Sequence, residues 1–344
     1  MSASQQISEI LNTAQKIVIL QADNPDADSL GSALALEAIL AEQGKDVSLY
    51  CAVDMPDYLK YLEGWSRVNK DLPSQFDASV VVDASTLDLF ERLKDSGNTS
   101  WLAAKPCIVL DHHAESSNNI DFATATHNDH DASSTCEVIY AISKEFGWKL
   151  PTDALPYLLT GILGDTQGLS NQLTRAETYH IVGELVEQGV DRPALEELRR
   201  ASSKMPESVF RYKAKLIERT ELFADGRLAI VTIPQDEIIS YSPLYNPGPL
   251  IQTDMLQIAG VLVGVVCKVY DTGRVTGMIR CNPPGGIGGD LAAALGGGGH
   301  AFAAGFKVQD GRPFAEIKDE CIAKATELLD NLNRKDFDEA IQHA

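Results

Sequence analysis

The segment that decides the fold is Gln21-Ala22-Asp23-Asn24-Pro25-Asp26-Ala27-Asp28-Ser29-Leu30-Gly31-Ser32. It follows the apolar run Ile-Val-Ile-Leu at 17–20, whose β-branched side chains favour a buried parallel strand. It precedes residues 33–40, which are rich in helix formers. We therefore expect Asp26 and Asp28 on a loop at the carboxyl end of a strand, where open α/β sheets place ligands. Two nearby carboxylates suit a hard cation, but Asn, Pro, Asp and Ser also form turns and helix caps, so this segment alone leaves both interpretations open.

Composition places the chain among soluble globular proteins. Its 344 residues favour two domains, and 44% hydrophobic and 23% charged residues are ordinary values. The longest apolar run, 258–267, is too short to span a bilayer, and the N-terminus lacks the pattern of a secretory signal, so we expect a cytoplasmic protein with no membrane partner. Six scattered cysteines without a Cys-x-x-Cys pair indicate reduced, buried thiols.

The net charge of −20 argues against a surface that grips long duplex nucleic acid. Basic residues nevertheless crowd the segment 199–219, where seven of them occur as Arg199, Arg200, Lys204, Arg211, Lys213, Lys215 and Arg219. A solvated helix face is the favoured interpretation of this cluster.

The pattern of strands and helices predicts two α/β domains. Apolar strands expected at 46–51, 78–83 and 107–110 alternate with helices, which indicates a doubly wound, mainly parallel sheet over residues 1–190. A linker is expected at 191–212. Residues 213–344 would form a smaller α/β domain with a mixed sheet and Gly-rich loops at 285–299, and we expect the active-site cleft between the two domains.

Aspartate and histidine side chains recur where the predicted strands and helices end. Asp83 and the triplet Asp111-His112-His113 each follow an apolar strand, and Asp165 ends a helix. The carboxyl ends of parallel strands converge on one crevice, where crowded carboxylates and imidazoles need a cation. This mixture of oxygen and nitrogen donors suits Mn²⁺ or Mg²⁺ better than structural zinc, and two such ions suit phosphoryl displacement.

These motifs resemble, in order, those of the DHH phosphoesterase superfamily. The matching segments are Asn-Pro-Asp-Ala-Asp at 24–28, Val-Val-Asp at 81–83, Asp-His-His at 111–113, Thr-Gly-Ile-Leu-Gly-Asp-Thr at 160–166 and Gly-Gly-Gly-Gly-His at 296–300. The last of these, with Ala303-Ala304-Gly305, is similar to the DHH-associated C-terminal domain. The size resembles the nanoRNase and pAp-phosphatase branch, which clears oligoribonucleotides of a few nucleotides.

The resemblance implies a role for each motif. Asp26 and Asp83 would bind one divalent cation, and Asp28, Asp83, His112 and Asp165 the other; Mn²⁺ is preferred and Mg²⁺ is the alternative. Asp111 would orient an imidazole, and His113 would approach the scissile phosphate. Arg280 would meet substrate phosphate, and Gly297, Gly298, Gly299 and His300 would cradle the nucleotide. Ser134-Thr135-x-Glu137 also resembles a family segment, but we interpret it first as a helix cap.

Two positions depart from the family pattern. The family has histidine three residues before the proline, where this chain has Ala22, so one cation would lose a nitrogen ligand unless Gln21, Asp23 or water replaces it. Gln167-Gly168-Leu169-Ser170 replaces a segment that usually contains an aromatic residue and an arginine, which leaves substrate choice open. His127 and His130 have a spacing that zinc accepts, but a structural loop is the favoured interpretation.

The expected function is therefore hydrolysis of short single-stranded oligoribonucleotides or linear dinucleotides to mononucleotides, together with removal of the 3′-phosphate of pAp. One alternative is a nucleotide-binding regulator whose catalysis is weakened by Ala22. The others are an exopolyphosphatase and a cyclic-dinucleotide phosphodiesterase. The sequence does not decide whether the protein forms a homodimer.

Overall fold

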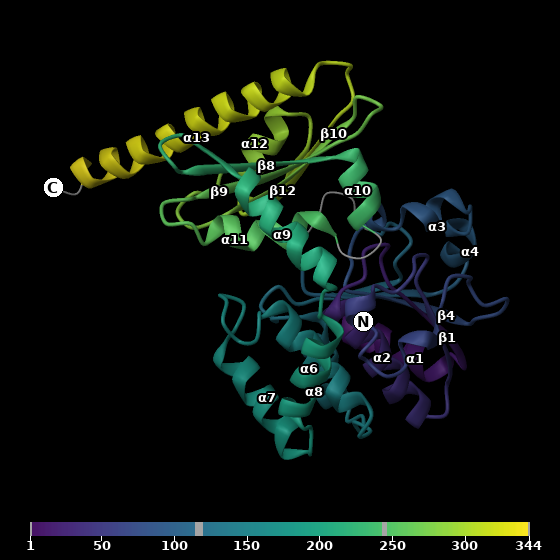
Figure 1. Cartoon of the computed structure of the whole chain (residues 1–344). Coiled ribbons are helices and arrows are strands. Elements are labelled where there is room, and N and C mark those ends of the chain that lie inside the picture. The colour runs from purple at the N-terminus through teal and green to yellow at the C-terminus, as the bar shows by residue number, and fades with distance from the viewer. Residues whose placement is uncertain (1, 114–119, 243–245, 343–344) are drawn as a thin grey trace. The chain divides into compact units, whose positions relative to one another are not determined.

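The computed structural model describes residues 2–113, 120–242 and 246–342, and the polypeptide divides into two compact units, Met1–Lys204 and Met205–Ala344. Figure 1 shows that each unit is built around its own sheet with helices against it. The segment 191–212, which we predicted as a linker, contains helix α8 and the beginning of α9.

The sheet of the first unit has six parallel strands in the order β3-β2-β1-β4-β5-β6. The chain runs outward from β1 in one direction and then restarts beside it at β4, so the strand order reverses between β1 and β4. The bounds are β1 (Lys16–Leu20), β2 (Asp46–Tyr50), β3 (Val68–Asn69), β4 (Ala78–Val82), β5 (Cys107–Asp111) and β6 (Ala125–Asn128). Such a reversal opens a crevice at the carboxyl ends of the two central strands.

Helices cover both faces of this sheet because alternate strand residues point to opposite sides. Ile17 and Ile19 pack into one buried cluster with α1, α2, α5, α6 and α7. Val18 and Leu20 pack into another, with residues of α3 and α4. The helices are α1 (Ala3–Thr13), α2 (Ala27–Glu42), α3 (Glu91–Asp95), α4 (Thr99–Ala103), α5 (Thr135–Glu145), α6 (Ala154–Asp165), α7 (Ala176–Glu187) and α8 (Arg192–Ser202), with single 3-10 turns η1 (Asp57–Leu59), η2 (Trp65–Arg67) and η3 (Leu87–Leu89).

The second unit has a mixed six-stranded sheet in the order β11-β12-β10-β9-β8-β7. Only β8 and β9 pair in parallel among these strands, and the other pairs are antiparallel. The strands are β7 (Glu221–Phe223), β8 (Leu228–Pro234), β9 (Val263–Val269), β10 (Val275–Cys281), β11 (Gly298–Gly299) and β12 (Ala303–Val308). The predicted fold class, a doubly wound parallel sheet followed by a smaller mixed α/β domain, is confirmed.

Helices also lie on both faces of the second sheet (Figure 1). Leu228 and Ile230 pack with α12 and α13, whereas Ala229 and Val231 pack with α9 and α11. The helices are α9 (Glu207–Arg219), α10 (Gln235–Tyr241), α11 (Pro247–Leu256), α12 (Gly288–Ala294) and α13 (Phe314–Gln342).

Two predicted loops contain regular structure. Strand β6 forms in the polar segment around His127 that we interpreted as a structural loop. Helix α12 forms within the predicted Gly-rich loop 285–299 because Leu291 and Ala292 are buried in the core of the second unit. Both segments are mostly polar or Gly-rich, so the few apolar residues that pack into the core gave no recognisable strand or helix pattern.

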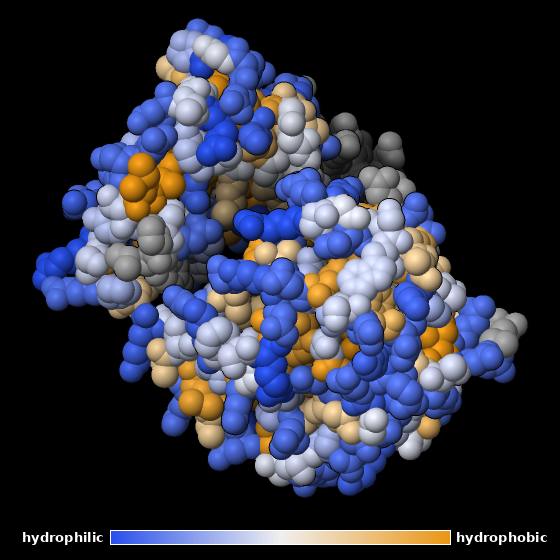
Figure 2. Space-filling view, turned by 90° about the vertical axis from the view of Figure 1, so that its right-hand side faces the viewer, coloured by the Kyte–Doolittle hydropathy of each residue, from blue (hydrophilic) through white to orange (hydrophobic). Residues whose placement is uncertain are grey.

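On the face drawn in Figure 2, hydrophilic residues predominate and apolar ones occur in small groups. Within the described residues, no helix combines the length and apolar character needed to cross a bilayer.

Candidate metal centre

The candidate site forms where β1, β4 and β5 end, beside the reversal of strand order. Asp26 is the N-cap of α2, and its Oδ1 accepts hydrogen bonds of 3.0 Å from the backbone N–H groups of both Asp28 and Ser29. The capping interpretation of this motif is thus correct for Asp26. These bonds occupy Oδ1, so Oδ2 remains available to a ligand, and Asp26 is an exposed residue at the rim of the site.

Asp28 is fully buried at the first turn of α2. Its Oδ2 accepts a 2.6 Å hydrogen bond from the backbone N–H of Thr135, and its Oδ1 one of 3.0 Å from Cys136. These two N–H groups open helix α5 and have no partner within the helix itself. Asp28 therefore joins the beginning of α2 to that of α5. Gly161 of α6 permits this close packing, since a Cβ there would lie 2.4 Å from Asp28 Oδ1.

Asp83 follows β4 in the left-handed backbone region, with φ of 59°. A non-glycine residue is uncommon there, and such conformations concentrate at functional sites. The side chain of Asp83 is buried and its Oδ1 accepts a 3.2 Å hydrogen bond from the hydroxyl of Thr135. The backbone conformation and this bond together fix the direction of the carboxylate.

The triplet Asp111-His112-His113 ends β5. Oδ1 of the buried Asp111 accepts hydrogen bonds from His112 N (2.8 Å) and His113 N (3.3 Å) and lies 2.8 Å from His113 Nδ1. Asp111 thus orients the imidazole of His113, whose side chain is 56% exposed. The ring of His112 is buried, and its Nδ1 lies 3.3 Å from the carbonyl oxygen of Ala132, which favours a proton on Nδ1 and leaves Nε2 to face the aspartates.

Asp165, the last residue of α6, completes the cluster. One of its carboxylate oxygens lies 3.0 Å from His112 Nε2, while Asp83 Oδ1 lies at 3.7 Å and Asp28 Oδ2 at 4.0 Å from the same atom. Two overlapping groups in the described part of the chain have donor atoms close enough to share an ion. They are Asp28-His112-Asp165 and Asp83-His112-His113, and Asp26 belongs to neither.

The electrostatics of the cluster reflect burial of several like charges. The pKa of Asp83 is raised well above its ordinary value, first by burial and then by the negative charges of Asp28 and Asp26. The pKa of Asp28 is raised by burial and by Asp165. That of Asp26 is also raised: although the residue is exposed, neighbouring atoms displace water from its carboxyl group, and this outweighs the hydrogen bonds from Ser29 and Asp28.

For the two histidines, interactions with neighbouring carboxylates outweigh the effect of burial on the pKa. Burial lowers the pKa of His112, but its interactions with Asp165 and Asp28 outweigh burial and raise that pKa to about 9. The pKa of His113 is raised chiefly by its hydrogen bond to Asp111, whose own pKa is lowered because hydrogen bonds from His113 and the backbone outweigh burial. The buried anionic cluster thus draws in protons, as it would draw in a cation.

These residues fit divalent cations. His112 Nε2 is buried and lies within 4.0 Å of three carboxylates, of which that of Asp165 is the nearest at 3.0 Å. Asp111 Oδ2 is buried without a hydrogen-bond partner among the described residues. Buried polar atoms are normally hydrogen-bonded and buried like charges need compensation, so three carboxylates around one imidazole nitrogen, beside a carboxylate oxygen without a partner, suit a divalent cation.

The other predicted residues lie elsewhere. Arg280 on β10 and the segment Gly297–His300 around β11 belong to the second unit. His127 lies in strand β6, not in a loop, and His130 is exposed. Within the described residues, neither belongs to a group able to share an ion.

Sequence reasoning missed the full role of Thr135. Ser134 is the N-cap of α5, as predicted, and accepts a 3.1 Å hydrogen bond from Glu137 N. Thr135 donates its N–H to Asp28 and its hydroxyl to Asp83, so one residue positions two aspartates. Glu137 is buried and pairs with Arg175 at 2.8 Å. The resemblance of the Ser-Thr-x-Glu segment to the family was the signal that pointed to this role.

Comparison with known proteins agrees with this geometry. Residues 16–162 match the model of the DHH family, N-terminal domain. The bifunctional oligoribonuclease and PAP phosphatase NrnA of Bacillus subtilis is 25% identical over 295 residues, which are 85% of this chain and 89% of that protein.

Two solved structures show the same fold. An exopolyphosphatase-related protein from Bacteroides fragilis superposes with a TM-score of 0.82 at 23% identity, covering 95% of this chain and 97% of that one. RecJ from Thermus thermophilus in complex with Mn²⁺ has a TM-score of 0.55 at 16% identity, covering 94% of this chain and 54% of that one.

Proposed function

Because residues 16–162 match the DHH family, N-terminal domain, we propose that the protein is a metal-dependent phosphoesterase that hydrolyses short oligoribonucleotides or linear dinucleotides to mononucleotides and removes the 3′-phosphate of pAp. The single observation that supports this most is the convergence of three carboxylates on the buried Nε2 of His112. The similarity to an enzyme named as an oligoribonuclease and PAP phosphatase supports the choice of substrate class.

We assign the cations as follows. Asp28, Asp83, His112 and Asp165 would hold one ion, and Asp26 and Asp83 would hold the other. The distances around His112 Nε2 support the first set. The free Oδ2 of Asp26 supports the second. Mn²⁺ is the preferred ion and Mg²⁺ the alternative. When bound, such cations neutralise phosphate charge and lower the pKa of bound water.

The protein's own groups position and protonate the substrate. His113 presents an exposed imidazole whose Nδ1 is held by Asp111 at 2.8 Å, so Nε2 is the atom that approaches the scissile phosphate. Its raised pKa keeps a proton available on that ring, and a proton there donates to a phosphate oxygen. Asp111 acts through His113 and is a positioning residue.

Residues of the second unit are proposed to bind the substrate. Arg280 is an exposed arginine on β10 whose guanidinium fork suits phosphate. The backbone at Gly297 and Gly299 has no room for a side chain: a Cβ would lie 2.1 Å from Gly305 O and 2.6 Å from Ala304 Cα, respectively. A bare backbone of this kind can approach an anion closely, and His300 adds a donor.

The decisive assay incubates the protein with Mn²⁺ and a panel of pAp, pGpG, a labelled RNA pentamer, a cyclic dinucleotide and polyphosphate. We expect release of mononucleotide from the pentamer and pGpG, and release of phosphate from pAp. The Asp83→Asn variant should lose all three activities, while Arg211→Ala, a change at an exposed ion pair with Glu207, should retain them. Hydrolysis of polyphosphate or the cyclic dinucleotide alone would reject the substrate assignment. Nucleotide binding without any turnover would support the regulator instead.

A further inference from the structure

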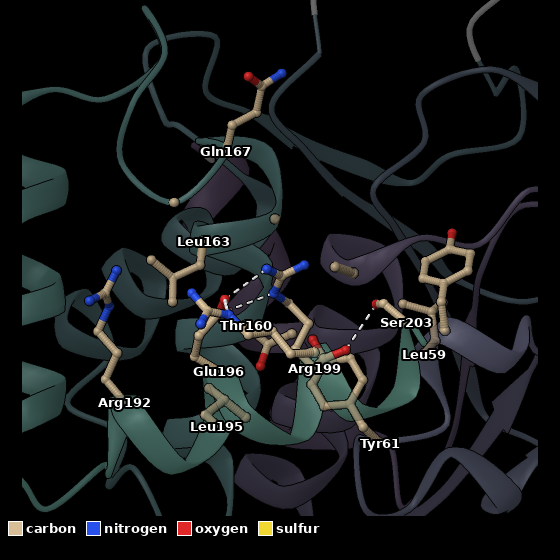
Figure 3. Close-up of a pocket in the computed structure, with 15 residues that line it drawn as sticks. Leu59, Tyr61, Thr160, Leu163, Gln167, Arg192, Leu195, Glu196, Arg199 and Ser203 are labelled. Carbon is tan, nitrogen blue, oxygen red and sulfur yellow. Dashed lines mark hydrogen bonds and ion pairs between the residues drawn. The ribbon is translucent and has the colours of Figure 1, made fainter. Parts of the chain in front are cut away.

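The basic residues that crowd the segment 199–219 are mostly paired with carboxylates. Arg199 and Arg200 both bind Glu196, each at 2.7 Å, where these side chains line the cavity of about 580 Å³ that Figure 3 shows. The other ion pairs of the segment join Arg211 to Glu207, Lys213 to Asp254 and Arg219 to Glu237. The paired cations of this segment therefore have little charge left for a ligand.

A second set of basic residues lies on the sheet of the second unit, on a face that is only partly covered. Along β10 and β12, buried residues alternate with exposed or half-buried ones. The buried residues, such as Ile279 and Phe306, pack in the cluster that contains α12 and α13. On the opposite face, α11 reaches Met278 of β10, and Gln252 donates a 3.1 Å hydrogen bond to Met278 O. The core on that side includes no described residue of β11 or β12.

Strand pairing arranges the side chains of this partly covered face in three rows, which we call the basic strip. His300 and Ala303 exchange two backbone hydrogen bonds of 2.8 and 3.3 Å, and Ala303 lies opposite Arg280. The rows are His300 with Ala303 and Arg280, then Gly298 with Gly305 and Met278, then Lys307 with Thr276 and Lys268. Four residues separate the first row from the third along each strand, so the two rows lie about 13 Å apart.

The basic strip contains positive charge and no acidic residue, in a chain of net charge −20. Lys268 donates a 3.0 Å hydrogen bond to Asn246 Oδ1, and burial lowers the pKa of Lys268 because it disfavours the charged form. Lys307 is exposed, and its side chain forms no hydrogen bond or ion pair with any residue that the structure describes. Two lysines on either side of Thr276, without a carboxylate, favour an anion between them.

The middle row leaves room for a ligand chain between the two basic ends. A Cβ at Gly298 would meet open space, and one at Gly305 would approach the backbone oxygen of Gly277 at 3.1 Å. Nothing therefore projects from β11 or β12 in this row. A backbone without side chains can be approached closely, so a sugar-phosphate chain can lie on it.

We propose that the basic strip binds the part of an oligonucleotide that continues beyond the phosphate held by Arg280, and that Lys307 binds a more distant phosphate of the same strand. The inference rests on the proposed function, because it extends the substrate contact assigned to Arg280 and His300. At about 3.4 Å per nucleotide, 13 Å corresponds to about four nucleotides of a stacked strand and to fewer of an extended one. A dinucleotide covers only part of this distance, so Lys307 favours the longer substrates.

The test measures binding of a labelled RNA pentamer and a labelled dinucleotide to the full chain by fluorescence anisotropy, at low salt in EDTA so that no cation contributes. Lys307→Ala should weaken pentamer binding about fivefold, because a charge-assisted contact with phosphate is lost, and should leave dinucleotide binding unchanged. The slope of the logarithm of pentamer affinity against the logarithm of salt concentration should also become shallower by about 0.7, the contribution of one phosphate contact with a single strand.

A matched pair of substitutions tests the charge of the strip. Thr276 is half-buried between Lys268 and Lys307. Thr276→Glu should weaken pentamer binding at least as much as Lys307→Ala does, whereas Thr276→Gln, which has the same size but no charge, should bind the pentamer normally. Lys215→Ala, at an exposed lysine of α9, is the control for a general loss of positive charge and should also bind the pentamer normally.

The proposal is overturned if the pentamer does not bind, if Lys307→Ala and Thr276→Glu bind it normally, or if both weaken the dinucleotide as much as the pentamer. Polyphosphate of equal charge that displaces the pentamer as readily as unlabelled pentamer would also overturn it, because the strip would then bind any polyanion. Hydrolysis assays with Mn²⁺ separate this proposal from the proposed function. Pentamer hydrolysis with the same KM in Lys307→Ala would reject the strip alone, and the expected binding without any hydrolysis would reject the proposed function alone.

Discussion

The raised pKa of His112 predicts that cations and protons compete for this site. Burial alone would lower that pKa, but Asp165 and Asp28 hold the imidazolium and raise it to about 9. A cation needs the neutral imidazole, so below pH 9 each binding event must release this proton. The ring is only 6% exposed, so solvent screening weakens these interactions little.

The magnitude follows from the pKa. At pH 7 a group with a pKa of about 9 is neutral in roughly one molecule in a hundred, so the apparent affinity for Mn²⁺ should rise about tenfold per pH unit between pH 6.5 and 8.5. The proton of His112 alone accounts for the release of about one proton per cation bound over this interval. In the metal-free protein the same shift of His112 stabilises the fold below about pH 6.5, and this contribution is lost as pH rises through about 9.

Isothermal titration calorimetry with Mn²⁺ checks the prediction. Titrations at several pH values give the affinity, and repeating each in buffers of different ionisation enthalpy counts the protons released. His112→Asn should lower the affinity and flatten the slope, whereas His130→Asn, at an exposed histidine outside the cluster, should change neither. An affinity that does not vary with pH over this interval would refute the assignment of His112 as a ligand.

Three further predictions test how the site is built. Thr135→Val removes the hydroxyl that donates to Asp83 while keeping the shape of the side chain, so activity should fall about tenfold, with the circular dichroism spectrum unchanged. Gly161→Ala places a Cβ 2.3 Å from Cys136 Sγ and should reduce both the unfolding temperature and the activity of the protein. Gly183→Ala on α7 is the control: a Cβ there meets open space, so the free energy of unfolding in urea should rise by up to about 1 kcal/mol. Gln21→Met removes two buried amide atoms without partners and should stabilise the metal-free protein by about 1–3 kcal/mol, yet weaken Mn²⁺ binding in calorimetry if the amide oxygen replaces the missing histidine ligand.

The sequence predicted the first sheet well because its strands are short, continuous apolar runs. The run at 17–20 lies within β1 and that at 107–110 within β5, and both strands are buried on two faces, as is usual in a parallel sheet covered by helices. Strand β6 and helix α12 were missed because each depends on contacts with distant residues. Ala125 packs into the core of the first unit and Leu291 into that of the second, and neither contact is visible in a polar or Gly-rich segment.

The candidate site was predictable to the extent that its residues end strands. Strand ends converge in a parallel sheet, so Asp83, Asp111 and His112 could be grouped without coordinates. The hydrogen bonds that position Asp28 and Asp83 come from the beginning of helix α5, and Thr135 lies 107 residues beyond Asp28 in the chain. The spacing of residues in the sequence does not reveal that Thr135 contacts Asp28, and a threonine at this position is equally typical of an ordinary helix cap.

The missing histidine at Ala22 shows where geometry goes beyond motif comparison. Ala22 is 4% exposed and packs with Val18 and Leu20 on the face of the sheet that α3 and α4 cover. Gln21 N still donates to Tyr50 O, so β1 continues its pairing with β2 one residue past its end. Alternation then places the Gln21 side chain on the other face, with Ile17 and Ile19, where α2 and α6 present Asp28 and Asp165. A fully buried amide with both polar atoms unpartnered is costly to retain, and a cation nearby would offset that cost. Gln21 is therefore the candidate for supplying the cation ligand that histidine supplies in the family, because Ala22 has no ligand atom in its side chain.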